Sequence, residues 1–221
     1  MFHGKHVDDR LNRAATWAGI RLNDARRDAL AGYGEWLATE GVEAGGLGPL
    51  EVPRIVDRHL ADSLVFAGVW GDTPDQVLDV GAGVGLPGIP LAITHPTTEF
   101  VLLDRSERRC VLARRATRVL GLQNVAVEQR DVKTESSMWP AIVFRASLPP
   151  EAAMRVAARL LADDGCAVLA LSRAGEPEIL PSTPPDCATD LVSTAPGVLD
   201  SPAWLLRMRR TEPRRKDGAL S

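Results

Sequence analysis

Residues 77–88 read VLDVGAGVGLPG. A short apolar run ends in a turn with glycine at alternate positions, and a segment typical of a proline-started helix follows. Glycine has no Cβ, so it adopts positive φ and lets a ligand lie directly on the backbone. A helix that begins after such a turn directs its free N–H groups into the same space. The stretch therefore predicts a cofactor-binding loop at the carboxyl end of a buried parallel strand.

Two cofactor motifs fit this loop. From Gly83 it reads Gly-x-Gly-x-x-Gly, the fingerprint of dinucleotide-binding dehydrogenases. From Asp79 it is an acid followed by Gly81, Gly83 and Gly85, the arrangement of S-adenosylmethionine (SAM)-dependent methyltransferases. A carboxylate attracts the sulfonium and ammonium cations of SAM and repels a pyrophosphate, so Asp79 favours SAM. The third interpretation is a strand-to-helix turn without a ligand.

Strand and helix patterns alternate from residue 75 to about residue 172. Strands are expected at 76–80, 99–104, 125–129, 141–144 and 167–171, and helices at 87–95, 107–120 and 151–161. This alternation predicts an α/β fold with a Rossmann-like, doubly wound and mostly parallel sheet. Runs at 189–194 and 204–209 predict an antiparallel pair at its edge. A dehydrogenase would also need a second domain, for which too little chain remains.

The first 70 residues have apolar side chains at helical spacing. Helices are expected around 11–18, 23–39 and 52–70, and the glycine-rich stretch 41–49 is interpreted as a loop. We therefore expect an N-terminal helical extension over residues 1–70 and a SAM-binding methyltransferase domain over residues 71–210. A solvated tail is expected over residues 211–221.

The composition is that of an ordinary globular protein. The 221 residues are 45% hydrophobic and 25% charged, with a net charge of −3. This charge argues against coating nucleic acid by bulk charge but leaves room for a local basic face. Three separated cysteines without a Cys-x-x-Cys pair predict reduced thiols and no metal site. No signal-like or membrane-spanning apolar run is visible, so we expect a cytoplasmic protein without membrane association.

Polar residues follow the other strands at the same edge of the sheet. Asp104 ends the second strand about 20 residues after the glycine loop, where an acid accepts both ribose hydroxyls of an adenosine. Alternatively, Asp104 or Ser106 caps the following helix. Asp131 and Val132 follow the third strand, either over the adenine or as an ordinary turn. Arg145 ends the fourth strand, either beside the transferred methyl group or in a salt bridge.

Basic residues provide candidates for substrate binding. Arg58 and His59 lie on the helix before the first strand; a buried, hydrogen-bonded histidine is the alternative for His59. The helix after the second strand is rich in arginine, which suits phosphate contacts or a solvated face. Its arginines are Arg105, Arg108, Arg109, Arg114, Arg115 and Arg118.

Three segments resemble the small-subunit ribosomal RNA guanine-N7 methyltransferases, also called the glucose-inhibited division protein B family. They are RHLADSL at residues 58–64, VLDVGAGVGLPGIPLAI at 77–93, and the pair LD at 103–104 followed by two arginines at 108–109. The resemblance implies a class I SAM-methyltransferase fold, SAM as methyl donor, and a guanine of 16S rRNA, free or in the 30S subunit, as acceptor.

Together, the loop and the resemblance give two sets of candidate residues. The expected SAM-binding residues are Gly81, Gly83, Gly85, Leu86, Asp104, Asp131, Val132 and Arg145. The expected substrate-binding residues are Arg58, His59 and Arg145. Guanine N7 has a free lone pair and needs no deprotonation, so we expect catalysis by proximity and alignment, without a catalytic base. We expect a monomer.

The chain departs from the family pattern on the substrate side. The residues WL at 36–37 and GPL at 48–50 replace the usual Trp-Asn and Asn-Leu-Thr, and SRAG at 172–175 replaces Lys-Gly. The fourth strand continues as ASLP at 146–149, where an Ala-Val-Ala run is usual. Two alternatives therefore remain. One is a SAM methyltransferase acting on a small molecule or another RNA, and the other is a non-catalytic SAM-binding relative.

Overall fold

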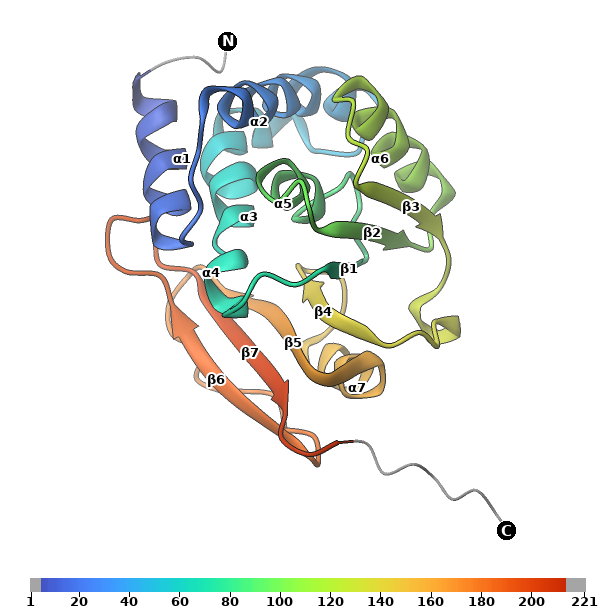
Figure 1. Cartoon of the computed structure of the whole chain (residues 1–221). Helices are drawn as coiled ribbons and strands as arrows, with labels where there is room; N and C mark the ends of the chain where they lie inside the picture. Colours follow the sequence, from blue (N-terminus) through green and yellow to red (C-terminus); the bar gives the residue numbers. More distant parts are fainter. Residues whose placement is uncertain (1–4, 214–221) are drawn as a thin grey trace.

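The computed structural model describes residues 5–213 of the chain. Within these residues, seven strands form one sheet in the order β3-β2-β1-β4-β5-β7-β6 (Figure 1). They are β1 (Gln76–Val80), β2 (Glu99–Asp104), β3 (Val125–Gln129), β4 (Trp139–Phe144), β5 (Leu161–Ser172), β6 (Cys187–Ser193) and β7 (Trp204–Arg210). Strands β1 to β5 pair in parallel, whereas β7 runs antiparallel between β5 and β6. The mostly parallel sheet and its antiparallel edge pair are confirmed.

Helices cover both faces of the sheet. The helices between the strands are α5 (Gly88–Thr94), α6 (Glu107–Val119) and α7 (Pro150–Leu160). Successive strand residues point to opposite faces. Val77 and Phe100 therefore pack with α5, α6 and the N-terminal helices, whereas Leu78 and Ile142 pack with α7. In Figure 1, α7 lies apart from α5 and α6. The sheet is doubly wound, and the expected α/β fold is confirmed.

The strand β5 is longer than the sequence predicts. It begins at Leu161 rather than at residue 167, and α7 ends one residue earlier, at Leu160. The polar residues Asp163 and Asp164 interrupt the apolar pattern, and Asp164 has a φ of 57°. The pairing of β4 with β5 also shifts register in this region, between Trp139 and Ala141. A strand that bends through polar residues gives no continuous apolar signal.

The N-terminal region is helical, as expected, but its third helix is divided. Its α-helices are α1 (Lys5–Trp17), α2 (Asp24–Trp36), α3 (Asp62–Leu64) and α4 (Ala67–Trp70). Asn23 begins α2 by accepting a hydrogen bond from the Arg26 N–H at 2.9 Å. The single helix expected over 52–70 is wrong: a 3₁₀ turn at Pro49–Arg54 and a π-helical segment at Ile55–Ala61 precede α3. Pro53 lacks the N–H that a regular helix would use.

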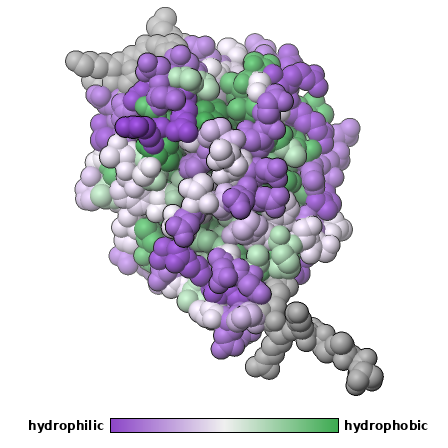
Figure 2. Space-filling model, in the orientation of Figure 1, coloured by the Kyte–Doolittle hydropathy of each residue, from purple (hydrophilic) through white to green (hydrophobic). Residues whose placement is uncertain are grey.

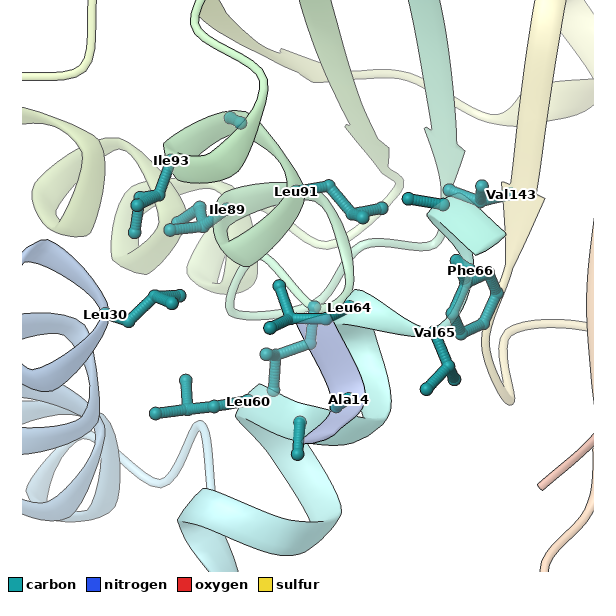
Figure 3. Close-up of a cluster of buried hydrophobic side chains, with 14 of the residues drawn as sticks. Ala14, Leu30, Leu60, Leu64, Val65, Phe66, Ile89, Leu91, Ile93 and Val143 are labelled. Atoms are coloured by element: carbon teal, nitrogen blue, oxygen red, sulfur yellow. The ribbon is translucent and has the colours of Figure 1, made fainter. Parts of the chain in front are cut away.

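The N-terminal helices share a hydrophobic core with the sheet. Figure 3 shows Leu30, Leu60 and Leu64 beside Ile89 and Leu91 of α5. Each of these five side chains is fully buried. Burying one such side chain contributes about 1.5–3 kcal/mol. The contact fixes the helices against the start of α5, which follows the glycine loop directly; the domain boundary expected at residue 70 stays a prediction.

The surface adds few constraints. In Figure 2, hydrophilic residues spread over the visible face and hydrophobic residues show between them in small groups. Within residues 5–213, no helix has both the length and the apolar content needed to cross a bilayer. Most of the tail expected from residue 211 lies outside the described residues, and residues 211–213 are exposed.

Candidate functional site

The glycine loop turns back over the end of β2. Gly81 follows β1 with a φ of +70°, and its N–H donates to the Leu103 carbonyl at 2.7 Å. A Cβ at Gly81 would lie 2.4 Å from the Cβ of Ser147, which follows β4. Strands β1 and β4 are neighbours from which the chain continues to opposite sides of the sheet, the place where α/β folds bind ligands. Gly81 therefore allows the loops after these two strands to meet.

Gly83 and Asp104 form the centre of the candidate site. The Gly83 N–H donates to Asp104 Oδ2 at 3.0 Å, and the Ser106 N–H donates to Asp104 Oδ1 at 2.8 Å. Gly83 has a φ of +62°, and no heavy atom lies within 4 Å of the position that a Cβ would take. Each carboxylate oxygen accepts more than one hydrogen bond, so Asp104 retains acceptor capacity for a pair of hydroxyls. Ser106, whose side chain accepts from the Arg109 N–H, caps α6.

A cavity of about 350 Å³ lies beside Asp104. Its lining residues are Gly45, Gly46, Asp104, Arg105, Ser106, Arg108, Arg109 and Leu112. A larger cavity of about 940 Å³ lies at the opposite edge of the sheet, where β2 and β3 begin, and includes Phe100 and Val125. The glycine loop and Asp104 belong to the carboxyl edge, so the smaller cavity is the one placed for cofactor chemistry.

The rest of the glycine loop packs against buried residues on its core side. Gly85 has a φ of +105°, and a Cβ there would lie 2.3 Å from Ile89 Cδ1. Leu86, an expected SAM contact, is 9% exposed and packs in the main core. Asp79 is fully buried and accepts from the Gly88 N–H at 2.8 Å. Burial raises the Asp79 pKa to about 7, against the lowering effects of that hydrogen bond and of the Arg145 charge. Asp79 therefore fixes the start of α5 from the buried side of the glycine loop.

Asp131 and Val132 lie in a turn after β3. Asp131 Oδ1 accepts from the Lys133 N–H at 2.9 Å and begins a 3₁₀ turn at Val132–Thr134. Arg159 of α7 donates to the Val132 carbonyl at 2.7 Å. This is the geometry of the turn expected as the alternative, and the adenine contacts stay a prediction.

Arg145 connects the end of β4 to α3 and to the segment before it. It donates to the Ser63 hydroxyl at 3.3 Å and to the Arg58 carbonyl. Its Nη2 lies 3.1 Å from His59 Nδ1 and 3.7 Å from Asp62 Oδ2. The side chain is only 15% exposed. The structure thus brings together the three residues expected to bind substrate, although Arg145 lies more than 80 positions after Arg58 and His59 in the sequence.

Two further charged residues extend this group. Arg173, which follows β5, pairs with Asp62 and with Asp200. The Nε atom of Arg58 lies 3.4 Å from Asp200 Oδ2. We call this group the charge cluster; its members are Arg58, His59, Asp62, Arg145, Arg173 and Asp200. The salt bridge expected as the alternative for Arg145 is present, and the substrate role stays a prediction.

His59 is the member of this cluster that stays uncharged at neutral pH. Its Nε2 lies 3.1 Å from Glu51 Oε2. Burial and then the Arg145 charge lower its pKa to about 4, against the raising effect of Glu51 and Asp62. His59 is therefore the buried, hydrogen-bonded histidine that its position on the apolar stripe indicates.

Several residues beside the loop were not expected there. The Tyr33 hydroxyl, fully buried in α2, donates to the Val84 carbonyl at 2.9 Å. Gly46 and Arg108 line the cavity beside Asp104. The glycine-rich composition of residues 41–49 was the available signal for Gly46, since it permits close backbone approach. For Tyr33 the sequence shows only an apolar helix face.

These features fit an adenosine cofactor. The open space over Gly83 admits a ligand onto the backbone, and the Asp104 carboxylate suits ribose hydroxyls. When bound, SAM supplies an electrophilic methyl group. Within residues 5–213, no three histidine, cysteine, aspartate or glutamate side chains are grouped to hold a metal ion.

Comparisons with known proteins point to one family. The family model GidB, described as rRNA small subunit methyltransferase G, matches residues 26–182. A Mycobacterium avium protein named ribosomal RNA small subunit methyltransferase G is 41% identical over 69% of this chain and 61% of its own length. A protein of the same name from Kineococcus radiotolerans is 40% identical over 73% of this chain and 65% of its own length. The chain thus spans less than two thirds of these relatives.

The solved structures agree on the fold. TrmN from Thermus thermophilus is similar with a TM-score of 0.50 and 20% identity, over 67% of this chain and 48% of that chain. A likeness at this identity concerns the fold alone. The strand order and the family match confirm the class I SAM-methyltransferase fold that the sequence resemblance implies.

Proposed function

The chain belongs to the rRNA small subunit methyltransferase G family, and we propose that it transfers a methyl group from SAM to guanine N7 of 16S rRNA. The observation that carries the proposal is the Asp104 carboxylate, which accepts from the Gly83 N–H beside the open space of the loop. A carboxylate held in this way is oriented before the cofactor arrives, which lowers the entropic cost of binding.

In this proposal the protein binds and orients, and performs no proton transfer. Asp104 accepts hydrogen bonds from the ribose hydroxyls, and Asp131 and Val132 lie along the adenine. The methionine part of SAM is lined by the loop residues Gly81, Gly83, Gly85 and Leu86. Arg145, Arg58 and His59 border the acceptor. Bound SAM would supply the methyl group, and these residues would align it with guanine N7, which needs no deprotonation, so alignment suffices.

The proposed partner is 16S rRNA, free or within the 30S subunit. Arginines on and just before α6 supply phosphate contacts: Arg109 and Arg118 of α6 and Arg105 before it are exposed. A ribosomal substrate would place the protein in the cytoplasm. We propose that the chain acts as a monomer, which light scattering on the purified protein tests.

A methylation assay on three substrate classes tests the function. The full chain is incubated with radiolabelled SAM and 30S subunits, naked 16S rRNA, or a metabolite panel. We expect label in rRNA, released as N7-methylguanine after digestion. Label in metabolites alone would establish a small-molecule methyltransferase, which the changed residues 146–149 and 172–175 favour as the second candidate.

Binding is measured separately. S-adenosylhomocysteine, the demethylated product, is titrated by calorimetry into the wild type and into Asp104→Ala. Loss of two hydrogen bonds to a charged group weakens binding by about 100-fold. Equal affinities would remove Asp104 from the ribose role. Tight binding without methyl transfer to any substrate would identify a non-catalytic relative.

A further inference from the structure

The cavity beside Asp104 has walls from two distant parts of the chain. One wall is Arg105, just before α6, with Arg108 and Arg109 from the first turn of that helix. The facing wall is Gly45 and Gly46, about 60 residues earlier in the sequence. The glycines belong to the turn that follows the π-helical segment at Leu37–Gly41. A ligand held by Asp104 would therefore lie against the N-terminal region as well as the sheet.

Arg108 fastens this turn to α6. Its Nε donates to the Ala44 carbonyl at 3.1 Å, and its Nη2 donates to the same oxygen. Gly45 has a φ of +65°, and a Cβ there would lie 2.2 Å from Arg108 Nη2. The turn and α6 are therefore in close contact, because Arg108 donates twice to the Ala44 carbonyl and Gly45 has no side chain between them. Arg108 is itself exposed, so solvent competes for this contact.

Gly46 packs closely against the glycine loop itself. A Cβ at Gly46 would lie 2.4 Å from Val84 Cγ1 and 2.9 Å from Leu112 Cδ1. Val84 comes directly after Gly83, so the position of Gly46 and that of the loop are coupled. The backbone bonds of the turn itself are local: the Gly46 and Leu47 N–H groups both donate to the Gly41 carbonyl.

We propose that the turn containing Gly46 forms the outer wall of the adenosine subsite, and that Arg108 holds this turn against α6. The inference rests on the proposed SAM site and adds to it two residues from outside the glycine loop and the strand ends. The wall shields the ribose edge of the cofactor from water. Arg108 is thus a positioning residue, acting through the Ala44 carbonyl rather than on the cofactor.

Two substitutions test the wall, each with a matched control. Gly46→Ala adds a methyl group against Val84; its control is Gly48→Ala, where a Cβ meets no heavy atom within 4 Å. Arg108→Ala releases the turn; its control is Arg155→Ala, an exposed arginine of α7. Calorimetry and stopped-flow displacement measure the affinity and the dissociation rate of S-adenosylhomocysteine. Thermal unfolding without ligand checks that each variant folds.

We expect Gly46→Ala and Arg108→Ala to bind about tenfold more weakly, mainly through faster dissociation, with both controls unchanged. Hydrogen exchange at residues 42–47 slows when the ligand binds the wild type, and is faster in free Arg108→Ala than in the free wild type. If Gly46→Ala does not fold, Arg108→Ala alone decides the question.

The outcome is distinguishable from failure of the proposed function. Suppose that Gly46→Ala and Arg108→Ala keep the wild-type affinity and hydrogen exchange, while Asp104→Ala binds weakly. This result would contradict the proposed wall but would still support the cofactor site. Wild-type affinity in Asp104→Ala would instead overturn the ribose role. Equal weakening by Gly46→Ala and Gly48→Ala would show a general effect of the turn and would also overturn the wall.

Discussion

Nη2 of Arg145 lies 3.1 Å from Nδ1 of His59. Since a guanidinium only donates, Nδ1 must accept, and the ring proton belongs on Nε2, where Glu51 Oε2 lies 3.1 Å away. The two contacts assign a neutral imidazole with a defined tautomer. Protonation would place an N–H against the Arg145 guanidinium. The pair thus connects β4 to the segment before α3 only while His59 is uncharged.

This relationship predicts how stability depends on pH. The His59 pKa is about 4 in the folded chain and about 6.5 unfolded, so the unfolded state binds the extra proton first. The stabilisation is fully present above pH 6.5 and is lost as pH falls toward 4, by up to about 1.4 kcal/mol per pH unit. Urea unfolding between pH 4.5 and 7.5 measures the slope, and His59→Gln should reduce it. An imidazole that titrates near 6.5 by NMR would contradict the assignment.

Asp79 should have the opposite effect on the pH dependence of stability, and Asp79→Asn should remove it. The folded Asp79 pKa, about 7, exceeds its ordinary value of 3.8, so its contribution to stability is largest below 3.8 and is lost as pH rises through 7. The neutral amide still accepts from the Gly88 N–H and carries no buried charge. The free energy of unfolding of the variant relative to the wild type should therefore rise between pH 4 and 7 and level off above.

The control for this experiment is Asp79→Ala. It leaves the buried Gly88 N–H without its partner and should lose about 1–3 kcal/mol. A difference between Asp79→Asn and the wild type that does not change with pH would show that Asp79 keeps an ordinary pKa.

Gly81→Ala and Gly83→Ala separate stability from binding. Both positions have positive φ, which costs alanine about 1–2 kcal/mol. A methyl group at Gly81 also meets Ser147, so Gly81→Ala should be the less stable of the two by thermal unfolding. A methyl group at Gly83 enters open space, so Gly83→Ala should fold but bind S-adenosylhomocysteine weakly. Tight binding by Gly83→Ala would show that the cofactor does not lie on this backbone.

Tyr33→Phe tests the tie between α2 and the glycine loop. It removes the hydroxyl that donates to the Val84 carbonyl at 2.9 Å and leaves that buried acceptor unpaired. We expect a loss of about 1–2 kcal/mol in the free energy of unfolding. Burial raises the Tyr33 pKa well above its ordinary value, so the loss should be constant from pH 6 to 9. A loss that varies over this range would point to another cause.

The sequence predicted the centre of the sheet better than its ends. The bounds of β1, β2 and β3 agree with expectation because each is a compact run of apolar residues bounded by turn residues. The early part of β5 was missed, since Asp163 and Asp164 leave no apolar pattern there. The helix expected over 52–70 failed because local periodicity does not distinguish π-helical and 3₁₀ turns from α-helix.

The site divides in the same way. The juxtaposition of Gly83 and Asp104 was predictable, because parallel strands bring their carboxyl ends to one edge. The contact between Gly46 and Val84 was not, since it depends on how the N-terminal helices pack on the sheet. The pairing of Arg173 with Asp62 and Asp200 likewise arises only in the folded chain.

The position of β7 has a consequence for the order in which the protein is made. Although β6 precedes β7 in the sequence, it pairs with the sheet only through β7, which lies between it and β5. A nascent chain that has reached residue 200 has a β6 segment with no adjacent strand and a β5 with one open edge. Such edges invite pairing with other chains. Completion of Trp204–Arg210 therefore pairs the open edge of β5 and one edge of β6 in a single event.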